Sequence, residues 1–217
     1  MRKSEGVRTL DLDQLGSLID IRRHDLRVVT SGNCCAPLRV LGALDELLGS
    51  WRLHLLNAPH GIPERPGVML ETCFVGAGMR HNERLVYFPM RLSQVPMLYE
   101  RRLGVDIVVA HTSVPHGGSV SLGLEVNVLP AAIAACRKAG GVVIAQVNPQ
   151  MPYTFGDGEL PLDTFDAVVE VDEPVLTHEA PPTDERAAAG GLTRAESAQI
   201  IGDRKSTRLN SSHERLS

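Results

Sequence analysis

Aromatic residues make up only 4% of this 217-residue chain, and there is a single tryptophan. We therefore expect a core built mainly from aliphatic side chains. Long apolar runs are also missing, because no stretch approaches the roughly 18 apolar residues that a membrane-spanning helix needs. Together with a charged fraction of 22%, these absences predict one large globular domain in the cytoplasm with no membrane segment.

Cysteine is also sparse, and its spacing excludes the usual zinc sites. The four cysteines form no C-x-x-C pair, and no histidine spacing completes a metal-binding set. We therefore predict no metal site. The formal net charge is −4, which argues against a general nucleic-acid-binding protein.

The remaining pattern alternates between β-branched runs and helical periods, with Gly and Pro at the joints. The spacing predicts strands over 26–33, 51–59, 67–76, 84–89, 105–113, 142–148 and 165–174, and helices over 36–49, 92–104 and 128–141. Ser93 is the expected N-cap of the second helix, and Pro37 suits the first turn of the first helix. This order predicts an α/β fold with right-handed βαβ units, an open and mostly parallel sheet, and flanking helices.

Ligands of such sheets bind beyond the carboxyl ends of the strands, so the loops there are the candidate sites. The loop "SGNCCAP" places the backbone N–H groups of residues 33–36 at a strand-to-helix turn. These groups would form a nest for an anion or a developing oxyanion. The alternative is a plain turn that contains two buried, unreactive thiols.

Other loop motifs fall short of known signatures. "GAGMRH" lacks the third glycine and the following helix of a dinucleotide fingerprint, and "SVSLG" around Ser121 lacks the first glycine of a nucleophile elbow. The loop histidines His111 and His116 have no evident partner. "VNPQMPYTFGDG" is either a rigid loop over a ligand or a hairpin turned at "GDG". Carboxylates there or nearby are Asp157, Glu159, Asp172 and Glu173.

Taken together, the loops resemble one family. "VVTSGNCCAPLRVLGAL", "FVGAGMR", "VYFPMRLSQVP", "VDIVVAHTSVPHGGSVSLG" and "VNPQMPYTFGDGELPLDTFDAVVEVDEP" occur in the order and at about the spacing of the acetyl-CoA hydrolase/transferase family. The resemblance is nearest to the 4-hydroxybutyrate CoA-transferase type and runs over residues 10–202. Each motif by itself is weak, and the ordered set is specific.

The resemblance implies a reaction in which CoA moves from an acyl-CoA to a free carboxylate. A glutamate attacks the thioester, passes through a mixed anhydride and becomes a glutamyl-CoA thioester, from which a second carboxylate takes the CoA. CoA is a substrate and no resident cofactor is implied. The partners implied are acyl-CoA and carboxylate substrates, and the full-length protein is expected to be a homo-oligomer.

The resemblance also assigns a cleft. The matching positions are Gly32, Asn33, Cys34 and Pro37 of the first loop, Ser121 and Gly123 of the S-L-G turn, and Asn148, Met151, Pro152, Gly156 and Asp157 of the last loop. Cys34 and Cys35 are interpreted as small loop residues, because cysteine has no catalytic role in the family. His116 stands where an aspartate is common.

No residue matches the nucleophilic glutamate, which the family carries in a second α/β domain. We therefore expect an N-terminal domain over 1–176, a linker and the start of a second domain over 177–202, and an artefact over 203–217. "DRKSTRLNSSH" can be back-translated into a sequence that looks like a sequencing adapter, beginning GAT CGG AAG AGC. Such a fragment is expected to show no CoA-transferase turnover. An acyl-CoA hydrolase, or a non-catalytic CoA-binding or interface module, is the alternative.

Overall fold

The computed structural model describes residues 7–177, which contain an eight-stranded, fully parallel sheet. The strand order is β1-β10-β8-β6-β2-β3-β4-β5. The strands are β1 Arg8–Thr9, β2 Leu26–Thr30, β3 Trp51–His54, β4 Val68–Thr72, β5 Leu85–Tyr87, β6 Ile107–Thr112, β8 Val142–Val147 and β10 Ala167–Glu170. The predicted fold class is therefore confirmed.

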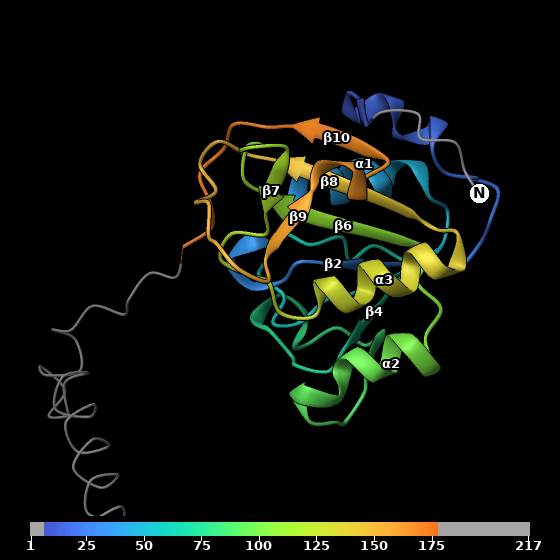
Figure 1. Ribbon diagram of the computed structural model, residues 1–217. Coiled ribbons are helices and arrows are strands. Elements are labelled where there is room, and N and C mark those ends of the chain that lie inside the picture. Colours follow the sequence, from blue (N-terminus) through green and yellow to red (C-terminus); the bar gives the residue numbers. More distant parts are fainter. Residues whose placement is uncertain (1–6, 178–217) are drawn as a thin grey trace, which may run out of the picture. The chain divides into compact units, whose positions relative to one another are not determined.

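Helices cover both faces of this sheet (Figure 1). Three are α-helices: α1 Leu38–Leu47, α2 Val95–Arg101 and α3 Leu129–Ala139. Short 3-10 turns are η1 Leu12–Ser17, η2 Asn33–Cys35, η3 Ala77–Met79, η4 Leu92–Gln94 and η5 Leu162–Thr164. One buried apolar cluster joins one face of the sheet to α2 and α3, and a second joins the other face to α1 and η1.

The central strand β6 shows why the sequence forms this layered structure. All six of its residues are buried. Val108 and Ala110 belong to the core beneath α2 and α3, whereas Ile107 and Val109 belong to the core beneath α1. Alternate side chains of a strand point to opposite faces, so a strand covered on both sides must be apolar almost throughout.

Two details of the helix prediction are wrong. Ser93 is not an N-cap, because it lies inside the 3-10 turn η4 and α2 begins two residues later at Val95. Pro96 then occupies the first turn of α2, where its missing N–H costs no hydrogen bond. Pro37 occupies the N-cap position of α1 rather than the first turn.

A second, two-stranded sheet was not predicted. β7 Ser119–Ser121 pairs antiparallel with β9 Glu159–Pro161, which lies about forty residues further along the chain. The "GDG" segment therefore leads into β9 and does not turn a local hairpin, so that alternative is wrong. Local periodicity could not predict this pairing, because each strand has only three residues and its partner is distant.

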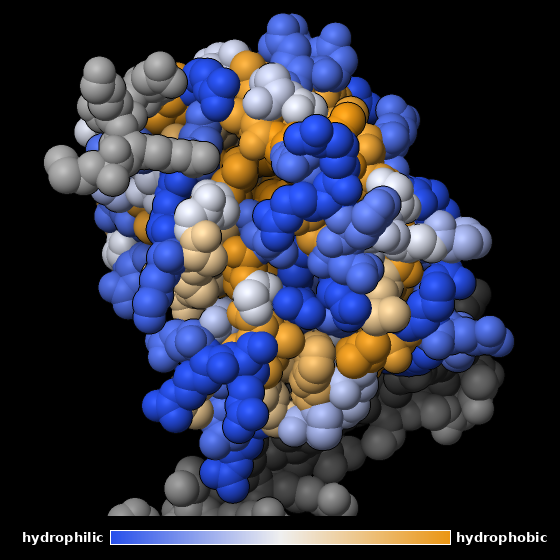
Figure 2. Space-filling view, turned by 90° about the vertical axis from the view of Figure 1, so that its right-hand side faces the viewer, coloured by the Kyte–Doolittle hydropathy of each residue, from blue (hydrophilic) through white to orange (hydrophobic). Residues whose placement is uncertain are grey.

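The amino ends of the parallel strands lie at one edge of the sheet, opposite the edge formed by their carboxyl ends. Figure 2 shows this side of the molecule, where charged and polar side chains are interleaved with apolar ones. In the carboxyl half of β4, Glu71 is buried and accepts hydrogen bonds from Arg27 of β2 at 2.7 and 3.1 Å. Arg52 of β3 adds a bond to Glu71 at 3.2 Å. The neighbouring strands β2, β3 and β4 are thus joined by ionic side chains as well as by their backbones.

Candidate functional site

The strand order places the candidate site beside β2. From β2 the chain adds β3, β4 and β5 in one direction, and then β6, β8 and β10 in the other. The strand order therefore reverses between β2 and β6, and ligands of open α/β sheets bind at the carboxyl ends of strands beside such a switch. The backbone N–H of His111 in β6 donates to Ser31 Oγ at 3.3 Å and joins β6 to the loop after β2.

Gly32 lets the first loop lie directly on the loop after β3. A Cβ atom at position 32 would lie 1.7 Å from the carbonyl oxygen of Leu56. The Asn33 N–H donates to the Asn57 carbonyl at 3.0 Å, and Asn57 Nδ2 donates to Asn33 Oδ1 at 3.1 Å. The Asn57 N–H in turn donates to the Phe74 carbonyl at 2.8 Å. The loops after β2, β3 and β4 are thus held together backbone to backbone.

These contacts correct the predicted anion nest. Of its four N–H groups, Asn33 donates to Asn57 and Cys35 donates to the Gly32 carbonyl at 3.0 Å. Neither group is available to an oxyanion without breaking a bond of the fold. Burial also raises the pKa of the Cys35 thiol to about 12. This thiol is therefore protonated and unreactive at neutral pH, as is usual for a buried cysteine.

Three of the predicted loops meet around Met151. Its sulfur lies 3.9 Å from Cys35 Sγ. A Cβ atom at Gly123, whose φ is +64°, would lie 2.3 Å from the same sulfur. The loops after β2, β7 and β8 therefore come together here. The close approach explains why the S-L-G turn needs glycine.

Ser121 is buried and serves the structure of this turn. Its Oγ donates to the Thr154 carbonyl at 2.8 Å and accepts from the N–H groups of Gly123 and Thr154 at 3.0 Å each. A hydroxyl with three such partners fixes the loop 151–157 against β7 and is not free to attack a substrate.

A buried polar network lies at the carboxyl ends of β6 and β8. His111 belongs to β6 and not to a loop, and burial lowers its pKa to about 4. Its Nε2 lies 3.2 Å from Asn148 Nδ2 and 3.5 Å from Gln146 Nε2. Because amide nitrogens only donate, we assign a neutral imidazole that accepts at Nε2. The expectation that His111 has no partner is wrong.

Gln146 connects this network to the first loop. Its Oε1 accepts from the Val40 N–H at the start of α1 (3.1 Å), and its Nε2 donates to Glu173 Oε1 (3.1 Å). Asn148 Nδ2 donates to the Glu173 carbonyl at 2.8 Å. Sequence reasoning missed Gln146, although a glutamine within the apolar run "VVIAQV" was a usable signal.

The outer part of the last loop lies apart from these contacts. Pro152, Gly156 and Asp157 are exposed, and the Gly156 N–H donates to Glu159 Oε2 at 3.1 Å. Within residues 7–177, neither Gly156 nor Asp157 has a hydrogen bond or ion pair to the first loop. Beside Asn148 lies a cavity of about 430 Å³ lined by Val114, Pro115, Val147, Pro149, Glu170, Val171 and Asp172.

Apolar side chains are exposed along this same edge. They are Phe74, Val114, Leu124, Phe155 and Leu176, and each follows the carboxyl end of a strand. In the part of the chain that the structure describes, no three His, Cys, Asp or Glu side chains are placed to hold a metal ion. No helix there has the length and apolar character to cross a membrane.

Known proteins match this chain in both sequence and structure. The family model for the acetyl-CoA hydrolase/transferase N-terminal domain matches residues 66–177, just over half of the chain. The 4-hydroxybutyrate coenzyme A transferase of Clostridium kluyveri is 29% identical over 174 residues. That alignment covers 74% of this chain and 39% of the relative.

Solved structures share the fold. The 4-hydroxybutyrate CoA-transferase of Porphyromonas gingivalis has a TM-score of 0.60 at 21% identity, covering 84% of this chain and 45% of its own. RipA of Yersinia pestis has a TM-score of 0.69 at 19% identity, covering 84% and 48%. The chain spans less than half the length of each of these three relatives.

Proposed function

The chain belongs to the acetyl-CoA hydrolase/transferase family, and from this premise we propose that it forms one side of a CoA-transferase site. There CoA passes from an acyl-CoA such as acetyl-CoA to a small carboxylate such as acetate or 4-hydroxybutyrate. The observation that carries the proposal is the convergence of the loops after β2, β7 and β8 on Cys35, Gly123 and Met151.

The proposed chemistry uses a glutamate that no residue of this chain matches. Its carboxylate attacks the thioester carbonyl and the CoA thiolate leaves, which gives a mixed anhydride. The thiolate then attacks the glutamyl carbonyl and releases the first carboxylate. The second carboxylate reverses both steps, takes the CoA and regenerates the glutamate. A hydrolase would replace the second carboxylate by water.

This chain would bind and orient the thioester. We assign oxyanion stabilisation to the N–H groups of Cys34 and Ala36, since those of Asn33 and Cys35 are donated within the fold. Gly32 and Asn33 hold this loop on the β3 loop, and Gln146 holds the start of α1 behind it. The cavity beside Asn148 has Glu170 and Asp172 in its lining, which disfavours it as the carboxylate pocket.

Isothermal titration of the chain with CoA tests this assignment. We expect Gly32→Ala to weaken CoA binding about tenfold or more, because the new Cβ would displace the loop from the Leu56 carbonyl. Gly42→Ala on α1 is the matched control, since a Cβ there meets nothing within 4 Å. Asn33→Ala is a milder second variant, and it should weaken binding less.

Equal CoA affinity in all three variants would contradict the proposed site. So would the absence of any binding heat at millimolar CoA.

The position of the nucleophile has its own test. We expect the purified 217-residue chain to show no exchange of CoA between acetyl-CoA and isotopically labelled acetate, because no residue of this chain matches the family's nucleophilic glutamate. Measurable exchange would place the nucleophile within this chain. Release of free CoA without an acceptor carboxylate would instead favour the hydrolase.

A further inference from the structure

The outward face of α1 carries an unusual arrangement of charge. Arg39 lies in the first turn of the helix and Glu46 in the last turn, and both side chains are exposed. This order opposes the helix dipole, which favours acids near the amino end and bases near the carboxyl end. Within residues 7–177, neither side chain has an ion-pair or hydrogen-bond partner. Both charges are thus left without compensation inside the described part of the chain.

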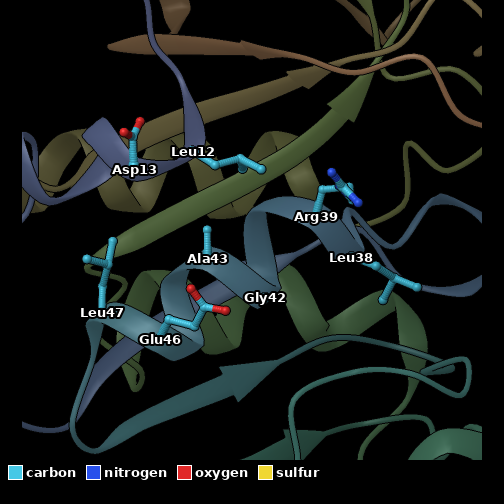
Figure 3. A pocket seen from close by; sticks show the side chains of 8 residues that line it. All are labelled: Leu12, Asp13, Leu38, Arg39, Gly42, Ala43, Glu46 and Leu47. Carbon is cyan, nitrogen blue, oxygen red and sulfur yellow. The ribbon is translucent and has the colours of Figure 1, made fainter.

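The same face is hollowed between α1 and η1. A cavity of about 530 Å³ is lined by Leu12, Asp13, Leu38, Arg39, Gly42, Ala43, Glu46 and Leu47. Figure 3 shows the Arg39 guanidinium at one end of this groove and the carboxylates of Glu46 and Asp13 toward the other. Small residues line the middle of this groove, because Gly42 and Ala43 lie at the middle of α1.

The six α1 residues of this groove are symmetric about a point between Gly42 and Ala43. Leu38 and Leu47 lie at equal distances from that point, as do Arg39 and Glu46. A second α1 helix laid antiparallel would therefore place Arg39 opposite Glu46 of the other copy, and Leu38 opposite Leu47. Such a contact is self-complementary, as a two-fold symmetric interface requires.

We propose that the outward face of α1 is an interface between two copies of this chain, paired antiparallel through Arg39 and Glu46. Two ion pairs would flank the symmetry axis, about 10 Å apart along the helix. Gly42 and Ala43 at the axis let the two backbones approach closely. The pairing also brings each Arg39 to the carboxyl end of the opposite helix, where a cation is favoured. This proposal is independent of the CoA site.

The test uses charge reversal and sedimentation equilibrium of the whole chain. The wild-type protein is expected to form a weak, concentration-dependent dimer, because one short helix pair buries little area. Arg39→Glu alone and Glu46→Arg alone each replace two attractions by two repulsions. Each should raise the dimer dissociation constant at least about tenfold. Circular dichroism should show unchanged or improved stability, since both changes agree with the helix dipole.

Three further measurements separate specific pairing from a general loss of association. The double variant Arg39→Glu/Glu46→Arg recreates both pairs in the reverse sense and should dimerise like the wild type. An equimolar mixture of the two single variants should form heterodimers, because one copy is then acidic and the other basic. Gly42→Gln should block the dimer while leaving the monomer folded, since a Cβ at this position meets nothing within 4 Å.

A wild-type chain that stays monomeric at several hundred micromolar would overturn the proposal. A dimer whose dissociation constant is unchanged by Arg39→Glu would overturn it equally, since another surface would then be responsible. Failure of both the double variant and the mixture to restore dimers would do the same.

Discussion

At the scale of single residues, His111 shows how position in the sheet decides chemistry. Its ring lies on the α1 side of β6, where it faces the side-chain amides of Gln146 and Asn148. The Cys35 backbone carbonyl favours the protonated form, but burial outweighs it and lowers the pKa to about 4. A neutral imidazole can accept from Asn148, whereas an imidazolium could not.

This depressed pKa has a consequence for stability. Between about pH 6.5 and about pH 4 the unfolded chain takes up a proton at His111 that the folded chain does not. The free energy of unfolding should therefore fall as the pH falls through this window, by at most about 1.4 kcal/mol per pH unit. Above about pH 6.5 the effect is absent. His111→Gln should remove this part of the pH dependence. The measurement is the difference in the free energy of unfolding, obtained with urea, between pH 7 and pH 5.

His116→Gln serves as the control. This exposed side chain packs against the Tyr153 ring, and its replacement should leave the slope in place. An NMR titration in which the His111 ring protonates near its ordinary pKa would contradict the expectation.

At the scale of elements, Glu71 couples the strands β2, β3 and β4. Burial by itself raises the pKa of Glu71, but His54 and the guanidinium groups of Arg27 and Arg52 outweigh it and lower the pKa to about 2. Arg27 and Arg52 are directly opposite each other on neighbouring strands. Their mutual repulsion is offset because Glu71 accepts from both.

Removing this carboxylate should destabilise the sheet. We expect Glu71→Gln to lower the free energy of unfolding by about 3 kcal/mol, because two arginines lose their buried counter-charge. In the wild type, the stabilisation is fully present above the ordinary carboxyl pKa of 4.5 and is lost as the pH falls toward about 2. Chemical unfolding near neutral pH and near pH 3 measures both effects.

Asp20→Asn is the matched control for Glu71→Gln, since the Asp20–Arg22 ion pair is exposed and should contribute little. Equal stability of Glu71→Gln and wild type would show that the buried network is not stabilising.

The α1 helix illustrates how far an element can be predicted. Its periodic leucines and flanking Pro and Gly located it within two residues at either end. The hydrogen-bond acceptor at its amino end could not be predicted. The Val40 N–H donates to the side chain of Gln146, which is over a hundred residues away. The wrong N-cap at Ser93 has a local cause instead, because the 3-10 turn η4 contains Ser93 and α2 begins only at Val95, with Pro96 in its first turn.

At the scale of the whole molecule, the two proposals concern two different surfaces of the described domain. The carboxyl edge carries the converging loops and the exposed side chains of Phe74 and Phe155. The outward face of α1 covers one side of the sheet and carries the self-complementary charges. The predicted boundary after residue 176 and the interpretation of 203–217 as an artefact concern mainly residues outside 7–177, and they stay predictions.

The amino-acid sequence alone determined the alternation of strands and helices, the parallel α/β class and the family, because periodicity and loop motifs are local properties. Tertiary structure alone decided which N–H groups of the first loop are already donated and that His111 is buried beside Asn148. It also decided that Ser121 holds a turn instead of acting as a nucleophile. The physical reason is the same in each case: the decisive partner lies far away in the chain, at Asn57, Asn148 or Thr154, and only folding brings it within hydrogen-bond distance.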